Sequence, residues 1–361
     1  MKILVINPGS TSTKIALFNN EDLVFEHKLD HAIDQNFQQQ FGKIGNVFDQ
    51  YPYRLEQILK ILTEKNITQL DAVVGRGGML PPISSGTYQV NQKMLDDLRD
   101  RPQANHASNL GAPIALEIAK KFNITDKAFI VDPVTTDEIE PKHKITGFPE
   151  IKRAPGWHAL NQKAVCREYA KSINKKYKDL NLICAHLGGG FSFGAHKKGK
   201  TINVINATTG EGPITPERSG QIPAQGLIDL CFSGKYTKEE ISYKTLGGSG
   251  LFALLRNKDM IDLENKYPSL DAEKKDIVDE MIAGISRNIC CLIPDFEGEK
   301  VDQIILTGGV VRWPLVVEKV KHDLYTIDVG ITVYPGEKEL EALRDGAIRV
   351  LNGQETVKTY T

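Results

Sequence analysis

The sequence has no long apolar stretch. Its first apolar run covers only residues 3–6 and begins after Lys2, which is too short for the core of a signal peptide. No later run approaches the roughly 18 apolar residues of a membrane-spanning helix. We therefore expect a soluble, cytoplasmic protein without a membrane partner.

The sequence also has no excess of either charge. It contains 45 lysine and arginine residues against 46 aspartate and glutamate residues, which gives a net charge of -1. No segment gathers the basic side chains by which a protein binds the phosphates of DNA or RNA. The balance of charge therefore excludes nucleic acid as an expected partner.

Cysteine and histidine form no metal-binding pattern. No CxxC pair is present, so the five cysteines are expected to be buried thiols rather than disulfides or zinc ligands. They are Cys166, Cys184, Cys231, Cys290 and Cys291. His106, His158 and His186 are also too widely separated for zinc-ligand spacing, so we do not expect zinc.

The length of the chain indicates more than one domain. At 361 residues it exceeds the size at which one hydrophobic core usually stops growing, so two lobes with a cleft between them are expected. Gly147, Pro149 and Pro155 interrupt the periodicity of the surrounding sequence. We place the boundary there, with one lobe at 1–149 and another at 150–338.

The beginning of the chain recurs near its middle. Residues 3–26 and 182–205 each contain a buried strand, a polar or glycine-rich turn, a second strand, and a polar turn into a third. A gapless alignment matches Asn7 with His186, Gly9 with Gly188, and the Asn19-Asn20 turn with the Lys198-Gly199 turn. The repeat predicts a duplicated α/β fold, although two β-meanders can also resemble each other by chance.

Apolar periodicity predicts the other elements. Helices are expected at 109–122, 157–177, 274–293 and 339–351. Short β-branched strands are expected at 72–74, 128–131, 304–307 and 331–334. The pattern is typical of mixed α/β lobes.

Three glycine-rich turns, at 8–14, 188–190 and 307–309, follow expected strands. Glycine lets backbone amides approach a phosphate closely, and hydroxyls and a lysine in the first turn add donors. No turn matches GxxxxGK[ST] or GxGxxG, so neither a P-loop nor a Rossmann fingerprint is present. One glycine after a strand is more often only a tight turn, but three such turns favour phosphate binding.

Two carboxylates and two arginines lie where a charged ligand could bind. Asp132 directly follows an expected strand and Glu339 opens the last expected helix, positions that suit Mg²⁺. A turn-forming aspartate and a first-turn helix charge explain them equally well. Arg76 and Arg218 lie in glycine-containing loops, where a guanidinium can bind carboxylate or phosphoryl oxygens in a bidentate way. The alternative for each arginine is a surface ion pair.

Four motifs, spread over nearly the whole chain, resemble those of the acetokinase family of acetate and butyrate kinases. They are NPGSTSTK at 7–14, HLGGGFSFGAH at 186–196, GEGPITPERSG at 210–220 and LTGGV at 306–310. The resemblance implies two duplicated ribonuclease-H-like lobes, as in actin-like ATPases and sugar kinases, that close on ATP. Residues 339–361 are then expected to complete the first lobe.

Three further motifs resemble the butyrate kinases more closely than the acetate kinases. They are VGRGG at 74–78, VDPVTTDE at 131–138 and WHALNQKA at 157–164. The sequence also departs from the acetate kinase pattern, since Gln162 and Gly189 stand where acetate kinases have histidine and asparagine. These departures argue against acetate as the specific substrate, but they do not argue against the phosphoryl-transfer chemistry of the family.

The resemblance implies a role for each candidate residue. Residues expected near the reacting groups are Arg76 for the carboxylate; Lys14, Arg218 and His158 for the transferred phosphoryl group; His186 beside it; and His106 near the substrate. Residues expected to hold Mg²⁺ are Asp132 and Glu339, with Glu337 and Glu341 as competitors. Residues expected to orient phosphates, metal-bound water or nucleotide are Asn7, Ser10, Ser12, Gly188, Gly189, Gly190, Gly308 and Gly309.

These roles predict in-line phosphoryl transfer from ATP to a short-chain carboxylate, which yields ADP and an acyl phosphate and is reversible. The acid is already ionised at neutral pH, so no general base is required and catalysis consists of positioning and charge compensation. Met79, Leu80 and Ile83 offer apolar walls for butyrate or isobutyrate, and the glycines after Arg76 leave room for the alkyl chain. A plain core role for these residues is equally compatible with the sequence.

Three rival functions remain open at this point. Acetate kinase differs only in acyl selectivity, whereas a sugar or polyol kinase of the same superfamily would use Asp132 as a base for a hydroxyl group. An actin-like ATPase without an acceptor substrate is the third. The family resemblance also implies a homodimer or a larger homo-oligomer.

Overall fold

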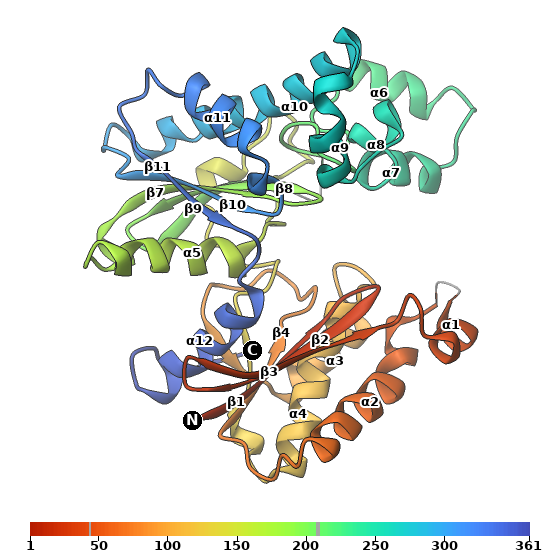
Figure 1. Ribbon diagram of the computed structural model, residues 1–361, viewed down its shortest axis with the longest axis vertical. Helices are drawn as coiled ribbons and strands as arrows, with labels where there is room; N and C mark the ends of the chain where they lie inside the picture. Colours follow the sequence, from red (N-terminus) through yellow and green to blue (C-terminus); the bar gives the residue numbers. More distant parts are fainter. Residues whose placement is uncertain (43–44, 207–209) are drawn as a thin grey trace. The chain divides into compact units, whose positions relative to one another are not determined.

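The computed structural model describes residues 1–42, 45–206 and 210–361 (Figure 1). The chain forms two compact units: Met1–Asp137 with Lys338–Thr361 is unit 1, and Glu138–Glu337 is unit 2. The chain passes from unit 1 to unit 2 between Asp137 and Glu138, which is earlier than the boundary that we placed at 149/150. The Glu138 carboxylate accepts hydrogen bonds from Lys163 Nζ at 2.6 Å and from the Thr201 amide at 3.0 Å.

Unit 1 is built on a seven-stranded sheet with the order β12-β5-β6-β4-β1-β2-β3. Its strands are β1 (Lys2–Pro8), β2 (Ser12–Asn19), β3 (Asp22–Asp30), β4 (Ala72–Arg76), β5 (Thr87–Gln89), β6 (Ala128–Val131) and β12 (Lys358–Thr359). The first three pair antiparallel, and β4 and β6 then extend the sheet parallel to β1.

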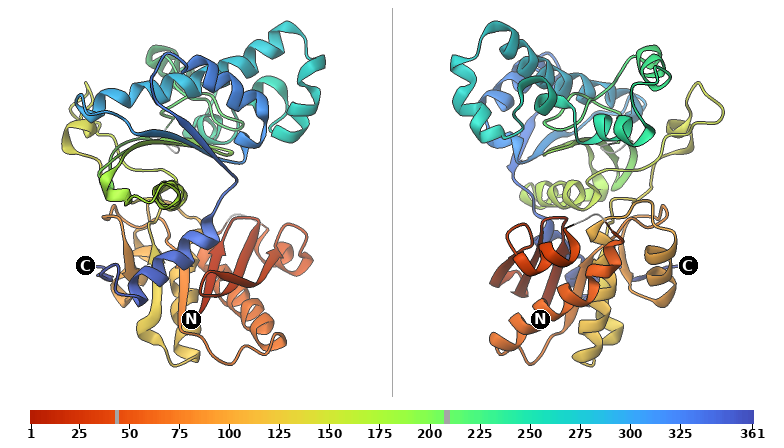
Figure 2. Two further views of the ribbon diagram at one scale, coloured as in Figure 1. Left: turned by 60° about the vertical axis from the view of Figure 1, so that its left-hand side comes forward. Right: turned by 90° about the vertical axis from the view of Figure 1, so that its right-hand side faces the viewer.

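Helices cover both faces of this sheet. They are α1 (Gln35–Phe41), α2 (Tyr51–Glu64), α3 (Gln92–Asp100), α4 (Gly111–Lys121) and α12 (Glu339–Leu351). Leu4 and Ile6 of β1 share one apolar cluster with α2 and α4, whereas α12 packs on the opposite face, where its Gly346 meets Val131 (Figure 2). Because both faces are covered, the central strands are apolar at consecutive positions rather than at alternate ones.

Unit 2 is built on a five-stranded sheet with the order β11-β10-β7-β8-β9. Its strands are β7 (Asn181–Leu187), β8 (Phe191–Lys197), β9 (Lys200–Ile205), β10 (Gln303–Gly308) and β11 (Ile331–Pro335). Its helices are α5 (Ala159–Ser172), α6 (Ala224–Cys231), α7 (Lys238–Leu246), α8 (Gly250–Leu255), α9 (Met260–Lys266), α10 (Ala272–Cys291) and α11 (Pro314–Asp323). Helix α5 covers one face of the sheet, and α10 and α11 cover the other (Figure 1).

The two sheets share one topology, which confirms the predicted duplication. The order β3-β2-β1-β4-β6 in unit 1 corresponds to β9-β8-β7-β10-β11 in unit 2, with the same parallel and antiparallel pairings. The predicted gapless alignment is wrong beyond the first turn, because Pro8 pairs with Thr13 across four residues, 9–12, whereas Leu187 pairs with Phe191 across three, 188–190. One residue more in the first turn makes Asn20 equivalent to Lys198, and both have left-handed φ values, 53° and 50°.

The predicted elements are present, with small differences at their ends. Helix α12 and strand β6 have the predicted bounds, whereas α5 ends at Ser172 rather than near residue 177, and a 3₁₀ turn at Ala107–Leu110 precedes α4. In the described part of the chain, no helix is both long and apolar enough to cross a membrane.

The expectation that all five cysteines are buried is wrong. Cys166 and Cys184 are buried, but Cys231 and Cys291 are exposed and Cys290 is half-buried. Cys231 ends α6, a helix that buries none of its residues, and Cys291 is the last residue of α10. An apolar helical pattern identifies a covered face only when another element packs on that face.

Candidate active site

In unit 1, candidate residues lie at one edge of the sheet. Strands β1, β4 and β6 are adjacent and parallel, with Ile6 opposite Gly75 and Arg76 opposite Val131. The carboxyl ends of parallel strands meet at the same edge, where α/β proteins commonly bind ligands. This register brings Asn7 at the end of β1, Arg76 at the end of β4 and Asp132 after β6 to that edge. Lys14 lies directly across from Asn7 on β2.

The guanidinium of Arg76 holds a carboxylate. Its Nη2 lies 2.9 Å from Glu339 Oε1, and its Nη1 donates to Glu339 Oε2 and to Asn7 Oδ1, both at 3.1 Å. Asn7 Nδ2 completes the arrangement by donating to Glu339 Oε2 at 2.7 Å. Sequence reasoning assigned Arg76 to the substrate and Glu339 to the metal. The structure shows that Arg76 has the bidentate geometry for a carboxylate, and that Glu339 supplies one.

Close backbone packing positions Arg76. A Cβ atom on Gly75 would lie 2.1 Å from the carbonyl oxygen of Gly111, and one on Gly111 would lie 2.2 Å from the carbonyl oxygen of Arg76. Neither position can accept a side chain without a backbone shift. The first turn of α4 is therefore held directly against the end of β4.

Asp132 is buried, with 1% of its surface exposed, and has a φ of +36°. Its Oδ1 accepts hydrogen bonds from Ser85 Oγ at 2.6 Å and from the Gly86 amide at 2.8 Å. The two predicted Mg²⁺ ligands are therefore held by different residues. Ser85 and Gly86 hold Asp132, whereas Arg76 and Asn7 hold Glu339. A left-handed backbone at a buried carboxylate is costly and is often associated with a functional site.

The turn between β1 and β2 is supported by an arginine that sequence reasoning missed. The fully buried Arg54 of α2 donates from Nη1 to the Gly9 carbonyl at 3.0 Å and to Thr13 Oγ1 at 2.8 Å. Burial lowers the pKa of Arg54 to about 10, which still leaves it charged at neutral pH. No local motif marks Arg54, because it acts on a turn some 40 positions earlier in the chain. Ser10 in this turn is exposed and Ser12 is half-buried.

We expect Arg54→Met to lower the free energy of unfolding by about 2 kcal/mol or more, because it leaves the Gly9 carbonyl and the Thr13 hydroxyl without their buried donor. Denaturant unfolding measures the change. Arg99→Met is the matched control, since Arg99 pairs with exposed aspartates of α3 and its replacement should cost at most about 0.5 kcal/mol. Equal losses in the two variants would contradict a supporting role for Arg54.

His106 also lies in this neighbourhood. Its Nδ1 is 2.8 Å from Ser108 Oγ and accepts from the Ser108 amide at 3.1 Å. Burial, and then the positive charges of Arg76 and Arg54, lower the pKa of His106. The ring is therefore neutral at neutral pH and close to the candidate carboxylate-binding arginine.

In unit 2, the two predicted histidines are stacked. The rings of His158, which precedes α5, and His186 of β7 have centroids 3.7 Å apart and planes 9° apart. His186 Nδ1 accepts from Asn161 Nδ2 at 2.8 Å, and its Nε2 lies 3.5 Å from Glu337 Oε1. Stacked imidazoles at this distance repel each other strongly if both are charged.

Arg218 lies against the predicted glycine turn at 188–190. A Cβ atom on Gly190 would be 2.3 Å from Arg218 Nη1, so only glycine leaves space for the guanidinium. Thr215 joins the two segments, since its hydroxyl donates to the Gly189 carbonyl at 2.9 Å and accepts from the Arg218 amide at 3.0 Å. Burial lowers the pKa of Arg218, and its Nη1 has no hydrogen-bond partner in the described part of the chain. A buried cationic donor of this kind is suited to bind an anion.

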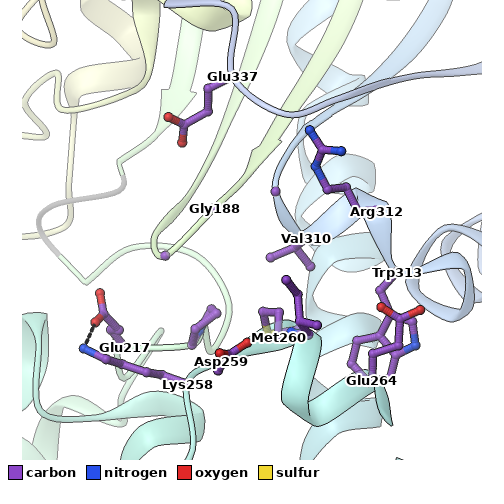
Figure 3. Close-up of a pocket in the computed structure, with 14 residues that line it drawn as sticks. Gly188, Glu217, Lys258, Asp259, Met260, Glu264, Val310, Arg312, Trp313 and Glu337 are labelled. Atoms are coloured by element: carbon purple, nitrogen blue, oxygen red, sulfur yellow. Dashed lines mark hydrogen bonds and ion pairs between the residues drawn. The ribbon is translucent and has the colours of Figure 1, made fainter. Parts of the chain in front are cut away.

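A pocket of about 620 Å³ opens beside this turn, within unit 2 (Figure 3). Its lining includes three predicted positions, Gly188, Gly189 and Gly309, together with Glu337. Gly308 is outside the lining, and a Cβ atom there would lie 2.3 Å from the Leu187 carbonyl. Gly308, with a φ of +100°, therefore allows β10 to pass close to β7.

Sequence reasoning missed most of the pocket lining. The missed residues are Pro216, Glu217, Lys258, Asp259, Met260, Ile261, Glu264, Val310, Arg312 and Trp313. Figure 3 shows charged side chains of two segments, 258–264 and 310–313, around apolar groups such as Met260 and Val310. The segment at 258–264 carries no recognisable binding motif, and only the fold brings it to the glycine turns.

Comparison with solved structures identifies the class of fold. The acetate kinase of Porphyromonas gingivalis matches 97% of this chain and 99% of its own, with a TM-score of 0.78 at 19% sequence identity. The fold is thus the duplicated ribonuclease-H-like fold shared by actin-like ATPases and sugar kinases, as the sequence motifs predicted.

The sequence comparisons identify the family. The model of the acetokinase family matches residues 147–347. A probable butyrate kinase of Clostridium botulinum (strain Alaska E43 / Type E3) is 46% identical over 99% of both chains. Butyrate kinase 2 of Clostridium acetobutylicum is also 46% identical over 99% of both. The chain belongs to the acetokinase family.

Proposed function

We propose that this protein is an ATP-dependent kinase of short-chain carboxylic acids, with butyrate or a branched analogue such as isobutyrate as the preferred acceptor. The products are ADP and an acyl phosphate, and the reaction is reversible. The geometry of Arg76, whose guanidinium already holds a carboxylate together with Asn7, is the observation that carries the proposal. The full-length relatives named butyrate kinases support the choice of acid.

The acceptor needs no general base, because a carboxylic acid with a pKa near that of glutamate is ionised at neutral pH. Catalysis then consists of bringing one anion onto another and compensating their charge. In this proposal Arg76 orients the carboxylate, and Lys14, Arg218 and His158 contact the transferred phosphoryl group. The proposed contact between Arg218 and the phosphoryl group is supported by its buried Nη1, which lacks a hydrogen-bond partner among the described residues.

The nucleotide is proposed to bind in the pocket of unit 2. Its glycine turns offer backbone amides for phosphates, and apolar side chains such as Met260 and Ile261 suit an adenine ring. A magnesium ion would be held by Asp132 and Glu339, since Mg²⁺ prefers one or two carboxylates completed by water and phosphate oxygens. The ion would neutralise charge on the nucleotide phosphates.

The predicted acyl pocket needs one correction. The space beside the glycines after Arg76 is not free, since a Cβ atom on Gly77 would meet Pro133 at 2.6 Å and one on Gly78 would meet Leu98 at 2.6 Å. Leu80 is fully buried in the core of unit 1. Met79 and Ile83, which are half-buried, remain as candidate walls for the alkyl chain.

We expect kcat/KM to rise from acetate through propionate to butyrate or isobutyrate. Each buried methylene contributes about 0.8 kcal/mol, so two methylenes favour butyrate over acetate by roughly tenfold. Acyl hydroxamate formation with ATP, Mg²⁺ and hydroxylamine measures the series, and glycerol and hexoses are the negative controls. A preference for acetate would identify an acetate kinase, and phosphorylation of a sugar alone would overturn the carboxylate proposal.

A further inference from the structure

A polar cluster is buried behind His158, on the face of β8 that α5 covers. Side chains alternate along a strand, and Phe191 and Phe193 accordingly join the apolar cluster on the α10 side. Ser192 and His196 point the other way, toward α5, and each has 0% of its surface exposed. From α5, the fully buried Gln162 reaches into the same layer. It lies four residues after His158, one helical turn further along.

These side chains form one continuous chain of hydrogen bonds. Tyr177 Oη lies 2.7 Å from His196 Nδ1, and His196 Nε2 lies 3.1 Å from Gln162 Oε1. Gln162 Nε2 donates to Ser192 Oγ at 3.0 Å and to the Ser192 carbonyl at 3.1 Å. Ser192 Oγ in turn lies 2.7 Å from His158 Nδ1. The chain thus runs from Tyr177 to the ring of His158.

The direction of the first bonds follows from what each group can donate. A carbonyl only accepts, so the Ser192 carbonyl orients the amide of Gln162 with its nitrogen toward Ser192 and its oxygen toward His196. His196 Nε2 must then carry a hydrogen. Burial, and then the charges of Lys163 and Arg167, hold the pKa of His196 well below its usual value, so its ring is neutral. Its bare Nδ1 therefore accepts from the Tyr177 hydroxyl.

The hydroxyl of Ser192 decides the state of His158. A hydroxyl has one hydrogen to donate and two lone pairs to accept with. Both lone pairs are occupied, by the Gln162 amide and by the His158 backbone amide, whose nitrogen lies 3.2 Å from Ser192 Oγ. Among the residues that the structure describes, the acceptor left for the remaining hydrogen is His158 Nδ1. His158 therefore accepts at Nδ1 and carries its own hydrogen on Nε2.

The cluster is closely packed. A Cβ atom on Gly194, between Ser192 and His196 on β8, would lie 2.6 Å from Gln162 Oε1 and 2.9 Å from His196 Nε2. The thiols of Cys166 and Cys184 approach His196 closely enough to suggest a metal site. Both ring nitrogens of His196 already have protein partners, however, so the ring serves the hydrogen-bond chain.

We propose that Tyr177, His196, Gln162 and Ser192 are positioning residues that hold His158 as a neutral imidazole with its hydrogen on Nε2. This inference rests on the proposed function for its purpose, since that hydrogen would be donated to an oxygen of the transferred phosphoryl group. Titratable groups near His158 include His186, stacked on its ring, and Glu337, whose Oε1 lies 3.5 Å from His186 Nε2. A neutral His158 also avoids charge repulsion with His186.

Protonation of His158 is unfavourable in this arrangement. A hydrogen on Nδ1 would point at a hydroxyl whose lone pairs are both engaged, so Ser192 would have to lose one of its bonds. Gln162→Glu removes the amide donor and adds a negative charge, which lets the Ser192 hydroxyl accept from a protonated His158. We expect this variant to raise the pKa of His158 by on the order of one unit or more.

The test uses the full chain with ¹⁵N-labelled histidine, and the His158 signals are assigned by their loss in His158→Asn. The wild-type protein is expected to show a neutral ring protonated on Nε2 across pH 6 to 8. Ser192→Ala is expected to give a mixture of both tautomers, because the donor to Nδ1 is gone. Gln225→Glu is the matched control for Gln162→Glu, since Gln225 lies on the exposed helix α6 and should leave His158 unchanged.

Two results would overturn the inference: a wild-type His158 protonated on Nδ1, or an unchanged His158 pKa in Gln162→Glu. The wild-type spectrum decides the first even if a variant fails to fold. The tautomer does not depend on turnover, so this test is separate from that of the proposed function. If His158 carries its hydrogen on Nε2 but the protein has no carboxylate kinase activity, the proposed function is contradicted. The inference about the tautomer of His158 then still stands.

Discussion

Replacing Arg76 by lysine is expected to lower kcat/KM for the carboxylic acid by on the order of 10²-fold or more, with the fold retained. Lysine keeps the charge but loses the planar fork, which holds both oxygens of Glu339 at 2.9 and 3.1 Å and also reaches Asn7. A single ammonium group cannot reproduce these directions. Steady-state kinetics with the acid as the varied substrate measures the loss, and circular dichroism checks the fold.

Arg99→Lys is the matched control for Arg76→Lys. Arg99 has a guanidinium that is also paired with carboxylates, but on the exposed surface of α3, so its replacement should leave the kinetics unchanged. Wild-type kcat/KM in Arg76→Lys would show that Arg76 only anchors the start of α12 through Glu339. An increase in KM for ATP without a change in KM for the acid would show that Arg76 binds the nucleotide rather than the acid.

Arg218→Met is expected to lower kcat by on the order of 10³-fold, the scale on which an arginine stabilises the charge of a transferred phosphoryl group. The guanidinium is buried against Gly190, and its Nη1 has no hydrogen-bond partner within the residues described. Because the interaction is needed most in the transition state, KM for ATP should change much less than kcat. Thermal unfolding should show no large loss, since methionine removes a buried charge.

Gly190→Ala tests the position of the Arg218 guanidinium without changing Arg218 itself. A Cβ atom at Gly190 would lie 2.3 Å from Arg218 Nη1 and must displace it, so this variant should lose kcat in the same direction as Arg218→Met. Arg287→Met is the control, because Arg287 pairs with Glu280 on the exposed surface of α10. Unchanged kcat in both active-site variants would leave Arg218 as a structural residue of its loop.

The expected and observed sites differ most at Glu339. Sequence reasoning treated Arg76 and Glu339 as ligands of two different groups, whereas the structure pairs them. If Glu339 turns to a metal ion, Arg76 is released for the substrate carboxylate. The two proposed roles are then coupled, a relation that residues 263 positions apart in the chain cannot reveal.

Local sequence determined the elements of secondary structure. The apolar run at 128–131 and the periodic pattern at 339–351 predicted β6 and α12 with their observed bounds, because side-chain spacing follows the geometry of a strand or helix. The repeated strand-turn-strand pattern also predicted the duplicated sheets, since each copy carries its own turn residues. The elements at 224–266 carried weaker signals, and α6 buries none of its residues.

The tertiary structure alone decided which side chains meet. Arg54 looks like any polar residue of an amphipathic helix, yet it is fully buried beneath the turn at Gly9. Gln162 and Ser192 form one chain of hydrogen bonds only because α5 packs on the sheet of unit 2. Sequence patterns express local periodicity, which acts over a few residues, whereas hydrogen bonds and ion pairs depend on distances in space. The sequence therefore determined the kinds of groups available for chemistry, and the packing of α5 and α12 on their sheets decided how those groups are paired.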